Sequence, residues 1–261
     1  MWIDSNTYVG HWPFRQVKNN SCKALLARMD EFGVEASLVT NFNGIFYKDT
    51  QAANRELYDE INSNTKFKNR LLPFGVINPV YSGWKEDLKI CSSNLGMKGI
   101  RIFPKYHRYE LDNPNCIELV KRARDMGLPI GLTLRMVDSR PSSWLDISHE
   151  WTLSDTLPII KAVPDAQFMI LNIANSTQLA EDDLSMFKKA NIFMDTSGRN
   201  IIDLGSLLTS FGKEKFGFGT HSPLLDYRTG ALRIASLRDD EADPTTREDL
   251  QAGNIKRFLN L

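Results

Sequence analysis

The chain has 261 residues, of which 42% are hydrophobic, and its 32 Lys and Arg balance 32 Asp and Glu. A net charge of zero disfavours proteins that attract nucleic acid or an anionic membrane through a long-range positive field. No apolar run approaches the roughly 20 residues that span a bilayer, and three widely spaced cysteines do not suggest a disulfide framework. We therefore expect a globular, cytoplasmic protein that binds neither nucleic acid nor membrane.

Short β-like runs alternate with amphipathic helical windows along the whole sequence. From Cys22 to Met29, for example, apolar residues recur at the three- and four-residue spacing of one helical face. Strands are predicted at 2–6, 36–40, 71–77, 99–103, 129–134, 167–171, 191–195 and 216–219. Helices are predicted around 22–29, 53–61, 84–91, 112–127, 157–163, 179–187, 201–211 and 231–237.

Two helix starts are marked by capping residues. Asp112 or Asn113 can cap the fourth helix, with Pro114 in its first turn. Thr245 and Glu248 have the spacing of a capping box, which predicts one more helix near the C-terminus.

Eight strand–helix pairs followed by a terminal helix predict an α/β fold, a (β/α)8 TIM barrel with an extra C-terminal helix. We expect one domain over residues 1–261, because no break in composition divides the chain. The alternative is a doubly wound open sheet, which favours a glycine-rich phosphate turn after the first strand. Residues 6–13 contain no such turn.

In a TIM barrel the active site lies at the carboxyl ends of the strands. A lone polar residue at a strand end often only forms hydrogen bonds within a loop. A cluster of candidates is therefore more informative than any one of them. The candidates at predicted strand ends are Asn6, Tyr8, His11, Arg101, Lys105, His107, Arg135, Arg140, Asn172, Asp195 and His221.

Five segments carry a resemblance to a known family. They are the first, fourth, seventh and eighth strands with their exits, at 3–10, 99–104, 193–198 and 218–223, and the closing helix at 253–259. In order and spacing they resemble the amidohydrolase-related proteins (amidohydrolase family 2), which are metal-dependent TIM-barrel hydrolases and decarboxylases.

The departures from that family concern its metal ligands. The family carries His-x-His on the first strand, where residues i and i+2 point the same way and can hold one ion. This chain has Asn6 and Tyr8 there, no histidine at 132–135, and His221 where the family has Asp on the eighth strand. An amide and a phenol are poor zinc ligands. The resemblance therefore implies a branch that has lost the usual metal site and needs no metal cofactor.

We favour a hydrolase of this superfamily that cleaves an amide, ester or lactone bond without metal. His221 would be the general base, because an unperturbed imidazole titrates near working pH. Asp195 would orient His221, while Tyr8 and Lys105 would act as acid or oxyanion donors.

The substrate is expected to be a small anion. Arg101, Arg135 and Arg140 could bind its carboxylate bidentately, although salt bridging among loops, with Asp138 between two arginines, would explain them too. Asn6, His11, His107 and Asn172 complete the expected binding residues.

Three alternatives stay open. The reaction could be decarboxylation of a small acid. One divalent ion, Zn or Mn, could be held by a rearranged set of His11, His107 and His221. The protein could also bind a ligand without catalysis. In addition, the aromatic residues Phe46, Tyr47, Trp144 and Trp151 suit either a homodimer surface or a cover over the pocket mouth.

Overall fold

The computed structural model describes residues 1–137, 143, 146, 151–173, 177–198, 201 and 203–261. Within these residues, eight strands form one sheet in sequence order, and every neighbouring pair is parallel. The strands are β1 (Trp2–Val9), β2 (Val34–Asn41), β3 (Leu71–Val76), β4 (Gly99–Ile102), β5 (Ile130–Thr133), β6 (Phe168–Leu171), β7 (Ile192–Asp195) and β8 (Phe216–Gly217).

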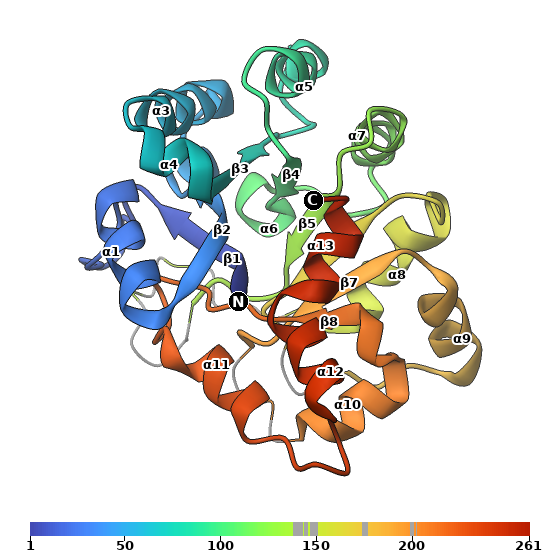
Figure 1. Cartoon of the computed structure of the whole chain (residues 1–261). Helices are drawn as coiled ribbons and strands as arrows, with labels where there is room; N and C mark the ends of the chain where they lie inside the picture. Colours follow the sequence, from blue (N-terminus) through green and yellow to red (C-terminus); the bar gives the residue numbers. More distant parts are fainter. Residues whose placement is uncertain (138–142, 144–145, 147–150, 174–176, 199–200, 202) are drawn as a thin grey trace.

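The sheet closes on itself between β8 and β1. Ser5 N donates to the Phe218 carbonyl at 3.0 Å, and the segment after β8 continues this pairing. There, His221 N donates to the Asn6 carbonyl and Tyr8 N to the Ser222 carbonyl, both at 2.8 Å. Closure excludes the open sheet, so the predicted (β/α)8 barrel is confirmed (Figure 1).

Helices surround the barrel, as Figure 1 shows. Strands β4, β6 and β7 are buried over their whole length, as expected for parallel strands covered on both faces. The helices are α1 (Cys22–Phe32), α2 (Asn43–Phe46), α3 (Thr50–Asn62), α4 (Thr65–Arg70), α5 (Trp84–Ser93), α6 (Pro104–His107), α7 (Pro114–Asp125), α8 (Leu153–Ala162), α9 (Glu181–Lys189), α10 (Leu204–Phe211), α11 (Arg228–Ala235), α12 (Pro244–Glu248) and α13 (Asn254–Leu259). In addition, η1 (Lys213–Lys215) is a 3-10 helix and η2 (Asp249–Gly253) is a π-helix.

The capping predictions have different outcomes. Asn113 caps α7 by accepting from Asn115 N, as expected. The predicted cap at Thr245 is wrong, because α12 starts earlier: Asp243 accepts from Thr246 N, and Pro244 takes the first turn. Asp at the N-cap followed by Pro is itself a strong start signal, and it competes with the capping box two residues later.

The C-terminal helix closes one end of the barrel. Ala252 and Ile255 pack with Ile3, Leu38 and other residues inside the barrel, and Figure 1 shows α13 crossing the end at which the N-terminus lies. Any pocket on the barrel axis must therefore open at the opposite end, where the strands have their carboxyl ends. No helix among the described residues is long and apolar enough to cross a membrane.

Candidate functional site

A network of buried polar side chains fills the barrel axis at the carboxyl ends of the strands. Asn6, Asp195 and His221 are each 0% exposed and Arg101 is 1% exposed. The Asn6 amide nitrogen donates to Asp195 Oδ2 at 2.8 Å, while its Oδ1 accepts from Arg101 Nη1 at 2.8 Å. We call these four residues together with Ser197, which donates to Asp195 Oδ2 at 2.6 Å, the central network.

The contacts of His221 fix its tautomer. Its Nε2 lies 2.8 Å from the Met136 carbonyl, which can only accept, so Nε2 carries the proton. Nδ1 is then free to accept from the Asn6 amide at 3.2 Å. Burial lowers the pKa of His221 to about 3, and the nearby charge of Arg101 acts in the same direction. The ring is neutral and both nitrogens are engaged, so this geometry does not present the accessible general base that the sequence predicted.

Asp195 contacts Asn6 rather than His221, which corrects the expected pairing. Its carboxylate accepts from Ser197, from Asn6 and from Asn172 N, the last at 2.6 Å. Burial raises the pKa of Asp195, whereas these hydrogen bonds and the Arg101 charge oppose the rise. Gly219 makes room for the carboxylate, since a Cβ at that position would lie 2.4 Å from Asp195 Oδ2.

Aromatic residues close the barrel mouth above the central network. We call this cluster the aromatic cap: Tyr8, Trp12, Phe42, Ile45, Val76, Phe103, Met136, Val137 and Leu224. Tyr8 stacks on Phe42 with ring centroids 4.7 Å apart, and its hydroxyl shares a 2.9 Å hydrogen bond with Thr133 Oγ1. Asn6, Asp195 and His221, which we expected at an active site, therefore do not line an open cavity, because the rings of Tyr8 on β1 and of Trp12 and Phe42 after β1 and β2 fill that space.

The side chains at the barrel axis do not fit a divalent metal ion of the kind that the metal-dependent family binds. Asn6 Oδ1, the amide oxygen at a family ligand position, already accepts from a guanidinium. Among the described residues, no three His, Cys, Asp or Glu side chains converge as a metal site would require. The alternative set is also wrong: His11 is exposed, His221 is buried, and His107 Nε2 donates to the Ile45 carbonyl at 3.2 Å.

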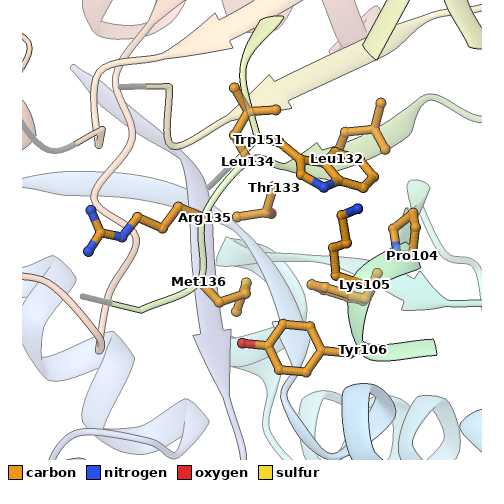
Figure 2. A pocket seen from close by; sticks show the side chains of 10 residues that line it. Pro104, Lys105, Tyr106, Leu132, Thr133, Leu134, Arg135, Met136 and Trp151 are labelled. Carbon is orange, nitrogen blue, oxygen red and sulfur yellow. The ribbon is translucent and has the colours of Figure 1, made fainter. Parts of the chain in front are cut away.

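A pocket lies beside the axis, at the ends of β4 and β5. We call it the β4–β5 pocket; it is a partly open hollow, and the space between its lining atoms together with the adjoining open solvent amounts to about 380 Å³. Figure 2 shows its side chains, and its lining is Phe103, Pro104, Lys105, Tyr106, Leu132, Thr133, Leu134, Arg135, Met136 and Trp151. An adjoining hollow shares Lys105 and Trp151 with it.

Lys105 and Trp151 give this pocket its polarity. Lys105 Nζ lies 5.3 Å from the centroid of the Trp151 ring and 3.7 Å from Glu110 Oε2. The Glu110 carboxylate is mostly exposed, so solvent screens this ion pair. Trp151 is 5% exposed, and its indole Nε1 is buried without a hydrogen-bond partner among the described residues. An ammonium and a donor that lacks an acceptor therefore stand together on the pocket wall.

The expected cluster of cations is mostly elsewhere. Figure 2 shows the Arg135 guanidinium directed away from Lys105 and Trp151, and Arg135 Nε donates to the Val137 carbonyl at 2.5 Å. Arg101 belongs to the central network. Arg140 and Asp138 lie outside the described residues. Of the four predicted cations, Lys105 is the one that the described structure aims into the pocket.

Other predicted site residues hold loops in place. Asn172 adopts a left-handed φ of 54° and donates to the Arg135 carbonyl at 2.7 Å. His107 ties α6 to α2, and burial lowers its pKa to about 4. Trp144 lies outside the described residues, and Trp151, expected on a dimer surface or over the pocket mouth, is buried in the wall.

Sequence reasoning missed Thr133 and Tyr106 as pocket residues. Tyr106 OH donates to Asp146 Oδ1 at 3.0 Å, and Thr133 lines the pocket while bonding Tyr8. A signal for Tyr106 was present, because Pro104 directly after a strand begins a short helix and aims the following side chains over the barrel.

No protein-family model matches the chain, and no curated protein matches it. Among solved structures, 2,6-dihydroxybenzoate decarboxylase from Rhizobium aligns with a TM-score of 0.72 at 14% identity, over 99% of this chain and 98% of its own. 5-Carboxyvanillate decarboxylase from Sphingomonas paucimobilis gives 0.71 at 13% identity, over 100% and 99%. A dihydroxybenzoic acid decarboxylase from Polaromonas, with bound manganese and the inhibitor 2-nitroresorcinol, gives 0.71 at 12%, over 100% and 97%.

The likeness to these structures shows a shared fold, and this fold is the (β/α)8 barrel that the sequence predicted. The alignments cover almost the full length of both chains. At identities this low the likeness concerns the path of the backbone, and the side chains at the axis have to be considered for themselves.

Proposed function

We propose that this protein binds small aromatic carboxylic acids in the β4–β5 pocket. The observation that carries the proposal is that one pocket wall holds both the Lys105 ammonium, 5.3 Å from the centroid of the Trp151 ring, and the Trp151 Nε1 donor, which is buried and has no partner among the described residues. A carboxylate can accept from both groups, and hydrogen bonds between charged groups are the stronger kind. Phe103, Met136 and the indole face offer apolar surface for a ring, which is the usual composition of a small-molecule site.

We further propose that the reaction is decarboxylation rather than hydrolysis. Hydrolysis needs a water molecule activated by a base or a metal. His221 is sealed and neutral, and the axis residues do not fit a divalent ion. Decarboxylation needs less: an orienting site for the anion and one proton donor. The structural neighbours named as decarboxylases of aromatic acids support the same choice.

Lys105 is the residue we assign as proton donor. Its ammonium transfers a proton to the ring carbon that bears the carboxylate. The carbon–carbon bond then breaks, its electron pair returns to the ring, and carbon dioxide leaves. The neutral amine regains a proton from water through the solvent-exposed side of Lys105. In net terms, a carboxylate and a proton give the arene and carbon dioxide.

Binding without turnover is the second candidate function. It is favoured by the complete burial of the central network, which keeps Asp195 and His221 out of contact with a ligand in the pocket.

One experiment separates the two candidates. Hydroxybenzoates labelled with ¹³C at the carboxyl carbon are incubated with the protein, and carbon-13 NMR follows free ligand, bound ligand and released carbonate. Decarboxylation predicts labelled bicarbonate from the wild type and none above background from Lys105→Met. Binding without release supports the second candidate. The absence of both binding and release contradicts the proposed pocket.

A further inference from the structure

Arg101 occupies an unusual place for a charged residue. It lies on β4 inside the barrel, 1% exposed. Its Nη1 donates to Asn6 Oδ1 at 2.8 Å, and its guanidinium carbon lies 4.6 Å from the centroid of the Tyr8 ring. Asn6 and Tyr8 are the two positions at which the family resemblance places a metal-binding His pair. One guanidinium therefore contacts both side chains that stand in for those ligands.

The charge of Arg101 is balanced through Asn6. The Asn6 amide accepts from Arg101 with its oxygen and donates to Asp195 with its nitrogen, so the guanidinium and the carboxylate are joined by one neutral side chain. A buried carboxylate without a cation nearby would carry a large desolvation cost. The rest of the protein accommodates Arg101, because Gly131 faces its side chain and a Cβ there would lie 3.0 Å from Arg101 Cγ.

We propose that Arg101 takes the place of a divalent metal ion in this barrel. It is a fixed internal cation that compensates the negative charge of Asp195, orients the Asn6 amide and excludes metal ions from the barrel axis. Exclusion follows from two features: Asn6 Oδ1 is already bonded, and a second cation beside a buried guanidinium meets strong repulsion where water is absent. This inference concerns the central network and does not depend on the ligand of the β4–β5 pocket.

Metal binding to the purified chain tests the proposal. Mn²⁺ is titrated and followed both by its electron paramagnetic resonance signal and by the thermal unfolding midpoint. The proteins are wild type, Arg101→Met, Asp195→Asn, the double variant Arg101→Met/Asp195→Asn, and Arg122→Met, a control at an exposed arginine on α7. We expect no saturable Mn²⁺ binding at the axis of the wild type or the control.

Arg101→Met frees an amide oxygen and leaves Asp195 without its cation. We expect this variant to bind Mn²⁺ saturably, with a dissociation constant at least about tenfold below the highest concentration at which the wild type shows no saturation, a difference of about 1.4 kcal/mol, and to gain thermal stability on adding Mn²⁺. The double variant should lose that gain. Without metal it should unfold at a higher temperature than Arg101→Met, because both charges have been removed.

Several outcomes would overturn the proposal. Wild-type protein that binds one Mn²⁺ per chain, and loses it on Asp195→Asn, would show that Arg101 excludes nothing. If Arg101→Met fails to fold, the double variant should fold; failure of both would show that Arg101 matters for packing rather than for charge. An Arg101→Ala variant adds an independent measurement, since methylguanidinium should raise its unfolding temperature and leave that of the wild type unchanged.

Discussion

Tyr8 and Thr133 share a 2.9 Å hydrogen bond that joins the closed centre of the barrel to the wall of the β4–β5 pocket. Tyr8 belongs to the aromatic cap and lies over the Arg101 guanidinium, whereas Thr133 lines the pocket. The pair shows how the two parts of the molecule are related: the charges of the central network lie behind the cap, and the proposed ligand site lies in front of it.

Replacing the pocket ammonium should weaken ligand binding. Lys105→Met keeps the length of the side chain and removes its charge, so we expect a loss of affinity for hydroxybenzoates of about 10- to 100-fold, since a hydrogen bond to a charged group contributes about 1.5–3 kcal/mol. Stability should hardly change, because the ion pair with Glu110 is exposed to solvent. Isothermal titration measures the affinity, with Lys121→Met on α7 as the matched exposed control. Equal affinity in Lys105→Met and wild type would remove Lys105 from the site.

Trp151→Phe should separate binding from stability. Phenylalanine keeps an aromatic face for Lys105 and removes the Nε1 donor, so affinity should fall about 3- to 10-fold, the effect of one hydrogen bond worth about 0.5–1.5 kcal/mol. The free energy of unfolding without ligand should hold or rise, because the lost donor has no partner in the described structure. Urea unfolding measures this. A stability loss with unchanged affinity would mean that the indole nitrogen serves packing alone.

His221 should make stability depend on pH in the acid range. Burial lowers its pKa from 6.5 to about 3 in the folded protein, so between these values the unfolded chain binds the proton and the folded chain does not. The contribution of His221 is therefore full above its unfolded pKa and is lost as the pH falls. His221→Asn, which tolerates the left-handed φ of 57°, should flatten this part of the curve of unfolding free energy against pH. If the curves of unfolding free energy against pH run parallel for wild type and variant, then His221 is not buried as a neutral ring.

Asp4 should make stability depend on pH in the opposite direction from His221. Burial raises its pKa from 3.8 to about 7, so the folded protein holds the proton more tightly than the unfolded chain does. Stability from this group is present below pH 3.8 and is lost as the pH rises through about 7. Asp4→Asn should therefore gain stability over wild type on going from about pH 5 to about pH 8, as measured by urea unfolding. A difference that does not change with pH would show that Asp4 is ionised throughout.

The sequence predicted the barrel well because hydrophobic periodicity and strand breakers act locally. The third strand, for instance, was predicted at 71–77, and β3 runs from Leu71 to Val76. The same reasoning brought Asn6, Asp195 and His221 together, since the ends of neighbouring strands meet at one edge of a barrel. Both inferences needed only the order of elements and the rule for their closure.

Accessibility could not be predicted in the same way. Whether His221 faces a cavity depends on where the rings of Tyr8, Trp12 and Phe42 lie, and this is decided by packing across several loops. The direction of Arg135 likewise depends on its bond to a carbonyl two residues away. Residue type and strand position gave the right neighbours, while the contacts that close the axis arise only in three dimensions.

A crystal structure of the chain with a bound hydroxybenzoate would show whether a small aromatic carboxylate binds in the β4–β5 pocket. We expect one carboxylate oxygen within about 3 Å of Trp151 Nε1, the other facing Lys105 Nζ, and the central network unchanged behind Tyr8. A ligand seated on the barrel axis, with its carboxylate on Arg101 or His221 and the aromatic cap displaced, would contradict it.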